Sequence, residues 1–373
     1  MRYVHILGAG GMYTKDFCKM LVENFSVEDH CFISGDPSHE NYRIARDSGC
    51  RVYKTTSVAA IKHFHQCDFV IAHGMNNPKV LALFYLWPRL LNKTNWVIWG
   101  GDIYDNTDPK NIRSQVICAM RQSVYPKVRW ATTLSRRDYE YAHKEYGLVA
   151  REFEGCYPVP ASTNSQLILN LRNNRDFCGD SRSFIVQVGN SATESNCHIE
   201  ALNALSRYKD ENVRIFMPLN YGLEGYELYA DYVESYAEKI FGKDRVFVLR
   251  DRVEGKNYLE MLSKVDVGVF NNNRQQAMGN ISQLLLLGAK IYIREDISMW
   301  KHFESLGCKL NDFNDIATQS FEDFIGYDTV QRAANISIIE KRHAIDEKVR
   351  TWKKIFSEMK QDTLYQRKHL SNE

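Results

Sequence analysis

The chain has 373 residues, of which 44% are hydrophobic and 25% charged, and a formal net charge of +2. This length predicts about two domains of roughly 150–200 residues each. The small net charge gives no chain-wide signature of polyanion binding, so nucleic acid is not an expected partner. The nine cysteines are scattered and never spaced C-x-x-C, which indicates reduced thiols in a cytoplasmic protein and neither a disulfide framework nor a zinc site.

The first half alternates short apolar strands with helical patterns. We expect its strands at residues 3–8, 31–35, 68–74, 95–101 and 129–135. These are near-continuous Val, Ile and Trp runs without strict alternation, which is typical of strands buried on both faces of a parallel sheet. The apolar run VLALFYLWPRLL at 80–91 is too short to span a bilayer, and we expect a core helix there rather than an interfacial one.

The second half repeats this style, so the fold class is α/β with two Rossmann-like domains. Its strands are expected at residues 183–191, 213–219, 245–251, 265–270 and 289–295. The predicted organisation is an N-terminal domain over 1–160, a polar, turn-rich linker over 161–183, a C-terminal domain over 184–335 and a helical tail over 336–373. Two such sheets joined by one linker predict a cleft between their carboxyl edges.

The stretch from 266 to 295 is the most informative part of the chain. It joins a buried strand to a short Leu-rich helix at about 281–287 through a polar loop that carries Arg274, Gln275, Gln276, Gly279 and Asn280. A permanent cation, amide side chains and a glycine before a helix N-terminus suit an anion, for which phosphate is the obvious candidate. Because the helix is apolar on nearly every side, it must be sandwiched within a domain, which puts the loop at the carboxyl edge of the sheet.

A second polar loop follows the strand at 183–191. It contains Gly189, Asn190 and Ser191, after which Ser195 or Asn196 is expected to cap a helix with His198 in its first turn. Taken alone, the loop is better explained as an ordinary capped connection between strand and helix. Together with the 274–280 loop on one sheet edge, it favours an anion site.

Two strand ends in the first half carry groups that could move a proton. His73 ends the first of these strands and Asp102 follows the second. A lone histidine at such a place is more often a core residue than a base, and Asp102 could instead be a turn or cap residue. The two make an acid/base site only if both strand ends meet in one cleft.

Several cofactor motifs are missing from the sequence. The turn GAGGMY at 8–13, which contains Gly10, has Tyr13 where a dinucleotide fingerprint has its third glycine, so we interpret it as a glycine-rich turn facing the cleft. No D-x-D follows a strand, and we interpret Asp102, Asp105 and Asp108 as solvated rather than metal-binding. We therefore expect no metal and no cofactor.

One segment of the first half is strongly basic. Six cations lie within 25 residues, namely Arg113, Arg121, Lys127, Arg129, Arg136 and Arg137. Near apolar side chains such as Val116, this excess predicts a face that docks on an anionic membrane surface. The alternative is a solvated basic face, or one neutralised by the second domain.

The polar loops together resemble the bacterial family of TDP-4-acetamido-4,6-dideoxygalactose (Fuc4NAc) transferases, glycosyltransferase family 56, which build enterobacterial common antigen. The motifs that carry the resemblance are HG-x-x-NP, W-x-x-WGGD-x-Y, ATTLSRRD, VGNSATESNCHIEAL and FNNNRQQAMGN, and they cover about residues 3–310. The resemblance implies a GT-B fold and metal-independent transfer from a dTDP-sugar. It also implies an undecaprenyl-diphosphate-linked saccharide as acceptor, at the cytoplasmic face of the bacterial inner membrane.

The resemblance also assigns sides to the candidate residues. It puts the nucleotide-sugar side at Gly189, Asn190, Ser191, Asn196, His198, Arg274, Gln275, Gln276, Gly279 and Asn280. It puts the acceptor side at Gly10, Gly74, Asn77, Trp99, Gly100 and Tyr104, with Asp102 or His73 as the base. The alternative function is a non-catalytic module that binds nucleotide sugars or serves in complex assembly.

Overall fold

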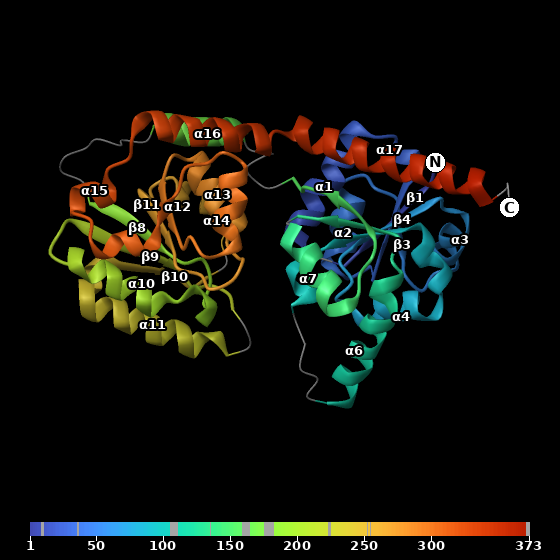
Figure 1. Cartoon of the computed structure of the whole chain (residues 1–373), viewed down its shortest axis with the longest axis horizontal. Coiled ribbons are helices and arrows are strands. Elements are labelled where there is room, and N and C mark those ends of the chain that lie inside the picture. The colour runs from blue at the N-terminus through green and yellow to red at the C-terminus, as the bar shows by residue number, and fades with distance from the viewer. Residues whose placement is uncertain are drawn as a thin grey trace. The chain divides into compact units, whose positions relative to one another are not determined.

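The computed structural model describes residues 1–8, 11–35, 37–104, 111–134, 136–158, 165–174, 183–222, 225–251, 253 and 255–370. The chain forms two compact units, one of Met1–Val159 with Ile345–Glu373 and the other of Pro160–Ala344. In each unit helices flank a central sheet (Figure 1). No helix in the described ranges combines the length and the apolar character needed to cross a membrane.

The first unit is built on a parallel sheet whose strand order is β3-β2-β1-β4-β5-β6-β7. Its strands are β1 (Tyr3–Leu7), β2 (His30–Ser34), β3 (Val52–Lys54), β4 (Phe69–His73), β5 (Thr94–Ile98), β6 (Trp130–Thr133) and β7 (Arg151–Glu154). Every residue of β1, β2, β4, β5 and β6 is buried, which confirms the five strands predicted from continuous apolar runs. The sequence prediction missed β3 and β7, the two edge strands, because they are short and partly exposed.

Seven helices of the first unit lie in the described part of residues 1–159, and several of them begin at a side-chain cap. They are α1 (Gly11–Asn24), α2 (Glu40–Asp47), α3 (Val58–Gln66), α4 (Pro78–Leu86), α5 (Gly100–Ile103), α6 (Ile112–Val124) and α7 (Arg136–Tyr146), with 3-10 turns η1 (Val27–Asp29), η2 (Pro88–Lys93) and η3 (Tyr125–Lys127). Ser57 accepts a hydrogen bond from the backbone N–H of Ala60 and so starts α3. Asn77 caps α4, whose first residue is Pro78, a favoured combination because proline has no N–H to leave unpaired.

The last helix of the chain, α17 (Ile345–Leu370), completes the first unit. It packs beside α1 (Figure 1). Its buried face carries Trp352, Phe356 and Met359, which join a core cluster that includes residues of β1 and β4. At its far end Asp362 accepts hydrogen bonds from the guanidinium of Arg129 and the indole of Trp130, both at 2.9 Å. The expected tail at 336–373 is thus divided between the units.

The second unit has a parallel sheet in the order β10-β9-β8-β11-β12-β13. Its strands are β8 (Phe184–Val188), β9 (Val213–Pro218), β10 (Val246–Leu249), β11 (Val267–Phe270), β12 (Lys290–Ile293) and β13 (Asn311–Asp312). The five strands predicted here are confirmed, and the two-residue edge strand β13 was missed.

Eight helices of the second unit lie in the described ranges. They are α9 (Ser165–Asn173), α10 (His198–Leu205), α11 (Tyr226–Phe241), α12 (Gly255–Leu262), α13 (Met278–Leu286), α14 (Ser298–Ser305), α15 (Phe321–Ile325) and α16 (Thr329–His343). Helix α9 lies inside the segment that the sequence suggested as a linker. Helix α13 packs against α16 and is buried along Ile281, Leu284 and Leu285, as its apolar sequence predicted.

Candidate functional site

The strand order of the second unit creates a topological switch point between β8 and β11. From β8 the chain proceeds to β9 on one side, and from β11 it proceeds to β12 on the other. The loops that follow these two adjacent strands therefore diverge at the carboxyl edge of the sheet, where α/β proteins bind ligands. They are the two polar loops that the sequence analysis paired, and Gly189 N donates to Val269 O at 3.0 Å where they start.

Asn196 holds the two loops together. Its Oδ1 accepts hydrogen bonds from Asn190 N and Asn272 Nδ2, both at 3.1 Å. Its Nδ2 donates to Ser191 Oγ at 3.0 Å and to Thr193 Oγ1 at 2.8 Å. Both ends of its buried amide are used in this way, so Asn196 fixes the shape of the two loops.

The expected cap of α10 is wrong. Neither Ser195 nor Asn196 stands at the N-cap of this helix, because both lie in the preceding 3-10 turn Glu194–Asn196. Cys197, which has a left-handed φ of 49°, stands at the N-cap of α10, and its side chain does not cap the helix. The asparagine amide is used between the loops instead, and a single sequence gives no sign of that long-range partner.

Gly189 is a position where a side chain does not fit. Its φ is +65°, and a Cβ there would lie 2.5 Å from His198 Nε2 and 2.9 Å from Asn196 Oδ1. His198 is the first residue of α10, as predicted, and its Nδ1 shares a hydrogen bond of 3.1 Å with the Tyr229 hydroxyl. Burial lowers the pKa of His198 to about 4, so its imidazole is neutral at pH 7.

Arg274 is tied to the first loop through one serine. Its Nε donates to Ser195 Oγ at 3.2 Å, and the same hydroxyl donates to Gln276 Oε1 at 2.6 Å. Gln275 Oε1 accepts a hydrogen bond of 3.4 Å from Ser298 at the start of α14. Arg274 is exposed, so its positive charge faces solvent at the switch point while the Ser195 hydrogen bond holds Nε in place.

Helix α13 begins earlier than predicted, which moves two candidate residues from the loop into the helix. Gly279 and Asn280 lie in its first turn. The helix starts at Met278, and its N-cap is Ala277, which has a φ of +62°. Asn280 Oδ1 accepts from Gln187 Nε2 at 2.8 Å, and Asn280 Nδ2 donates to the Tyr258 hydroxyl. Glycine and asparagine are poor helix formers, which is why sequence reasoning placed the start of the helix after them.

Several residues of this site were not found from the sequence. They are the loop and strand residues Gln187, Thr193, Ser195 and Asn272, and the tyrosines Tyr221, Tyr229 and Tyr258. The Tyr221 hydroxyl, for example, accepts a hydrogen bond of 2.6 Å from Asn190 Nδ2. Each tyrosine comes from a segment remote in sequence, and nothing in its local pattern marks it as a partner of the loops.

In the first unit, Asp102 joins the loops that follow β4 and β5. Its side chain is 1% exposed and accepts hydrogen bonds from Asn76 N at 3.1 Å, Trp96 Nε1 at 3.0 Å and Trp99 N at 3.1 Å. Burial raises the pKa of Asp102 to about 6, although these donors oppose the rise. The cap alternative is present in the structure, since Asp102 is the third residue of α5 and accepts from the Trp99 N–H before it.

His73 belongs to a chain of three buried imidazoles. His73 Nε2 shares a hydrogen bond of 2.9 Å with His5 Nδ1, and His5 Nε2 shares one of 2.9 Å with His30 Nδ1. The other nitrogen of His73 is hydrogen-bonded to the Tyr157 hydroxyl. Burial lowers the pKa of His73 to about 3 and that of His30 to about 4, and it holds the pKa of His5 well below its usual range. All three are therefore neutral at pH 7.

The remaining candidates on the expected acceptor side have identifiable local roles. Gly74 has a φ of +90°, and a Cβ there would lie 3.3 Å from Asp102 Oδ1. Gly100 opens α5 directly after Trp99, and the Tyr104 hydroxyl donates to Asp138 Oδ1 at 2.9 Å. Gly10, Asp105 and Asp108 lie outside the described residues, so the structure does not place them.

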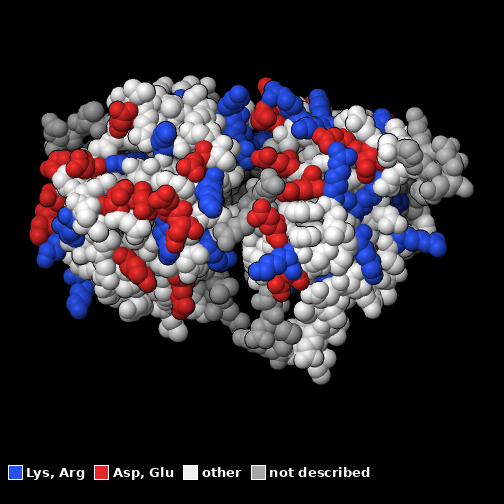
Figure 2. All heavy atoms as spheres, in the orientation of Figure 1, with Lys and Arg blue, Asp and Glu red and all other residues white. Residues whose placement is uncertain are grey.

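The prediction that the basic segment at 113–137 forms one continuous lipid-facing patch is wrong. Arg121 is buried, and Arg129 pairs with Asp362 of α17 at 2.9 Å. The side chains of Arg136 and Arg137 are outside the described set. On the face shown in Figure 2, basic and acidic side chains are interspersed over both units. The neutralising carboxylate comes from the far end of the chain, which is why the local excess of charge misled the sequence analysis.

Comparison with solved structures shows that the chain has the GT-B fold, which it shares with several solved glycosyltransferases. HepE of Anabaena, solved in complex with UDP, matches 96% of this chain and 100% of its own, with a TM-score of 0.67 and 12% identity. A glycosyltransferase from Rickettsia africae ESF-5 matches 96% and 98%, with a TM-score of 0.65 and 11% identity. WaaG, a glycosyltransferase involved in lipopolysaccharide biosynthesis, matches 91% and 95% at a TM-score of 0.54 and 11% identity.

The match to a family model is more specific than these structural likenesses. The model for 4-alpha-L-fucosyltransferase, glycosyl transferase group 56, matches residues 36–318, which is more than half of the chain and contains both switch-point loops of the second unit. The resemblance noted from the sequence motifs is confirmed by this match. The chain therefore belongs to the group 56 glycosyltransferases, the 4-alpha-L-fucosyltransferase family.

Proposed function

We propose that this protein transfers a deoxyamino sugar of the Fuc4NAc type from a dTDP-sugar to an undecaprenyl-diphosphate-linked saccharide during bacterial surface polysaccharide synthesis. The observation that supports this most is the meeting of two polar loops at the β8/β11 switch point of a GT-B glycosyltransferase of group 56. The choice of dTDP, of the sugar and of the lipid-linked acceptor rests on the sequence motifs. HepE, which has the same fold, binds UDP.

The second unit is the proposed donor side. A departing nucleoside diphosphate carries negative charge, which must be stabilised where it develops. The exposed guanidinium of Arg274 and the first N–H groups of α13 supply positive potential at the same sheet edge. Gly189 has no room for a Cβ, because His198 and Asn196 lie where it would stand, so the glycine allows the tight turn of this loop. These groups would do the work that a divalent cation does in other nucleotide-sugar sites.

The first unit is the proposed acceptor side, with Asp102 as the base in preference to His73. A pKa of about 6 leaves Asp102 ionised at pH 7 yet basic enough to take a proton. Both nitrogens of His73 are already hydrogen-bonded, and a pKa of about 3 makes it a poor proton acceptor. Asp102 also lies in the first turn of α5, directly after the carboxyl end of β5.

Replacing Arg274 with alanine should weaken dTDP binding by about 1.5–3 kcal/mol, roughly ten- to a hundredfold in Kd, the usual cost of one charge-assisted contact. Isothermal titration calorimetry with dTDP measures this directly. Arg214→Ala is the matched control, because Arg214 is exposed near the amino end of β9, at the opposite edge of the same sheet. Equal dTDP affinity in Arg274→Ala and the wild type would remove Arg274 from the donor site.

Replacing Asp102 with asparagine should lower turnover by about 10²–10⁴-fold, the usual contribution of a general base, while dTDP affinity is unchanged. An amide NH₂ would also face the N–H donors of Asn76 or Trp99, so folding is checked by circular dichroism. His73→Gln serves as the comparison and should keep turnover within a factor of ten. If His73→Gln is the inactive variant, the two assignments must be exchanged.

The transfer reaction itself should persist in EDTA, since the proposed charge stabilisation comes from Arg274 and α13. The assay follows nucleotide release from a panel of dTDP- and UDP-sugars with and without a lipid-linked acceptor. Release that requires the acceptor supports a transferase, whereas binding without release supports the non-catalytic alternative. Loss of activity in EDTA with recovery on adding Mn²⁺ would refute the metal-free mechanism.

The proposed location follows from the proposed acceptor. A saccharide linked to undecaprenyl diphosphate is held in a bilayer by its polyprenyl chain, so the enzyme must work at a membrane surface. We therefore place it as a peripheral protein on the cytoplasmic face of the bacterial inner membrane. Anionic lipids of that leaflet are the expected partner of the protein's basic side chains.

A further inference from the structure

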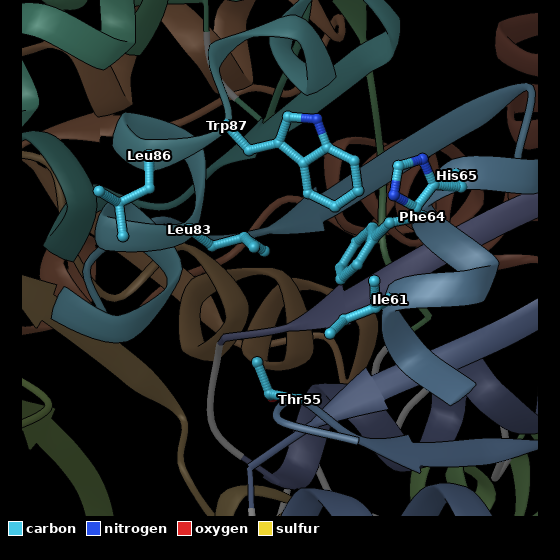
Figure 3. Close-up of a pocket in the computed structure, with 7 residues that line it drawn as sticks. All are labelled: Thr55, Ile61, Phe64, His65, Leu83, Leu86 and Trp87. Carbon is cyan, nitrogen blue, oxygen red and sulfur yellow. The ribbon is translucent and has the colours of Figure 1, made fainter. Parts of the chain in front are cut away.

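An apolar groove opens on the surface of the first unit, away from the residues discussed above. It has a volume of about 420 Å³ and is lined by Thr55, Ile61, Phe64, His65, Leu83, Leu86 and Trp87. Figure 3 shows that the lining comes from α3, from α4 and from the end of β3. Trp87 packs against the ring of His65 with centroids 4.5 Å apart. The lining contains no carboxylate.

Large apolar side chains stand in solvent along this groove. Leu86 is 80% exposed and Val58 is 83% exposed, and they lie on the two helices that border it. Tyr85 and Ile61, also on these helices, are about half exposed. Single exposed apolar residues need no explanation, but a group of them beside an apolar groove marks a surface that meets an apolar partner.

The segment that forms the groove is strongly basic in sequence. Residues 49–101 contain six Lys or Arg and only one carboxylate, Asp68. Asp68 Oδ2 accepts a hydrogen bond of 3.0 Å from Arg2 N. Lys62 lies one turn after Val58 on α3, and Arg89 follows Trp87 in η2, both exposed. The groove therefore combines protruding apolar side chains with a basic rim.

We propose that this groove and its rim, the α3/α4 face, dock the protein on an anionic phospholipid bilayer. Leu86, Val58 and Tyr85 enter the boundary between headgroups and acyl chains, while Lys62 and Arg89 meet the lipid phosphates. This proposal rests on the proposed function, and it names the surface that the function requires. The apolar run at 80–91, expected from the sequence as a core helix, is on this view buried on one side and interfacial on the other.

The position of α4 connects this face with the proposed acceptor side. The helix has nine residues, from Pro78 to Leu86, so its ends are about 13 Å apart. It begins at the Asn77 cap, directly after the loop that follows β4, and ends at Leu86 in the groove. If Leu86 is in the membrane, the loop that contains Gly74 and Asn77 lies within reach of a diphosphate at the bilayer surface.

A second surface groove provides an internal contrast. It has a volume of about 350 Å³, lies in the second unit, and is lined by Leu219, Tyr226, Glu227, Asp231, Glu234 and Arg250. Its three carboxylates would repel an anionic surface. Leu228 lies on α11, the helix that supplies most of this lining, and is 79% exposed. It is therefore a leucine about as accessible as Leu86, but with acidic neighbours instead of basic ones.

The test is sedimentation of the full-length protein with vesicles at low salt. One set of vesicles is pure phosphatidylcholine and the other is phosphatidylcholine with an equal part of phosphatidylglycerol. Wild-type protein should sediment with the anionic set at least about tenfold better. Val58→Ser with Leu86→Ser, and separately Lys62→Glu with Arg89→Glu, should each lower anionic binding at least about tenfold. The matched controls are Leu228→Ser for the first pair and Lys209→Glu with Lys301→Glu for the second, and both should bind as wild type does.

Two further measurements locate the contact and separate it from catalysis. Fluorescence quenching by brominated acyl chains should fall in Trp87→Phe. Trp96, Trp130 and Trp352 are fully buried, and the partly exposed Trp99 and Trp300 do not line the groove. The groove variants should keep wild-type dTDP affinity and wild-type transfer to a short-chain, water-soluble acceptor, while losing transfer to acceptor in vesicles. If the wild type transfers sugar to no acceptor at all, the proposed function is wrong. The vesicle experiment still tests membrane docking in that case.

Three outcomes would overturn the proposal. The first is equal binding of the groove variants and the wild type to anionic vesicles. The second is that wild type fails to bind them, or binds neutral vesicles as well. The third is a wild-type dimer, detected by light scattering, that Leu86→Ser converts to a monomer, since the α3/α4 face would then be an interface between copies of this chain.

Discussion

Lowering the pH from 7 to 5 should cost the first unit about 2 kcal/mol of folding free energy for His73 and a similar amount for His30. Their folded pKa values of about 3 and about 4 lie below the usual 6.5, so the unfolded chain binds protons first as the pH falls. The stabilisation is complete above about pH 6.5 and is lost progressively as the pH falls to the folded pKa, about 4 for His30 and about 3 for His73. His5, with its pKa well below the usual range, acts in the same direction. Because the three rings share hydrogen bonds, their effects will not simply add.

One buried group opposes this trend. The folded pKa of Asp102, about 6, lies above its usual 3.8, so protonation of Asp102 below about pH 6 favours the folded state. Between pH 7 and pH 5 this raises the free energy of unfolding by about 1.4 kcal/mol, which is less than the decrease caused by the two histidines. Urea unfolding between pH 7 and pH 5 measures the net change, and His5→Gln, which interrupts the imidazole chain, should flatten it. An unfolding free energy that is constant over this range would show that the histidines are protonated in the folded protein.

Replacing Trp352 with alanine should destabilise the first unit by about 3–5 kcal/mol, the cost expected for deleting a fully buried aromatic side chain. The Trp352 ring lies 5.0 Å from that of Phe17 and 5.5 Å from that of Phe356, measured between centroids. Its Nε1 donates to Cys156 O at 2.9 Å, so the substitution also leaves a buried carbonyl without this partner.

Denaturant unfolding of Trp352→Ala is the measurement, followed by circular dichroism. Tyr365→Ala is the matched control, because Tyr365 is an aromatic residue of the same helix that is 65% exposed, and it should change stability by less than about 0.5 kcal/mol. A loss below about 1 kcal/mol for Trp352→Ala would mean that α17 lies on the first unit without completing its core.

Strands were predictable from the sequence where burial on both faces left a continuous apolar run, as in β4 and β11. Edge strands such as β3 have one side towards solvent and only three residues, which a pattern search cannot separate from loop. The start of α13 was placed late because Gly279 and Asn280 have low helix propensity, and tertiary contacts of Asn280 override that preference.

The pairing of the two loops of the second unit was predicted for a sound physical reason. Parallel strands end at one sheet edge, so polar residues after β8 and β11 had to be neighbours if the strands were adjacent. The side-chain partners that fix the loops could not be predicted in the same way. Asn196 bonds with Asn272, and His198 with Tyr229, across gaps in sequence that no local rule connects. The assignment of Arg274, Asp102 and the rest of the site to catalysis stays a proposal.

The chain order of the first unit has a consequence for protein synthesis. The chain leaves this unit at Val159, builds the whole of Pro160–Ala344, and only then supplies Ile345–Glu373. Domains usually fold in the order in which the ribosome releases them. Here all residues of the second unit are synthesised before the first unit is complete. Until α17 is synthesised, the N-terminal sheet lacks Trp352 and Met359, and part of its apolar core is uncovered. A ribosome that stalls late in the message would therefore release an aggregation-prone N-terminal half attached to a folded second unit.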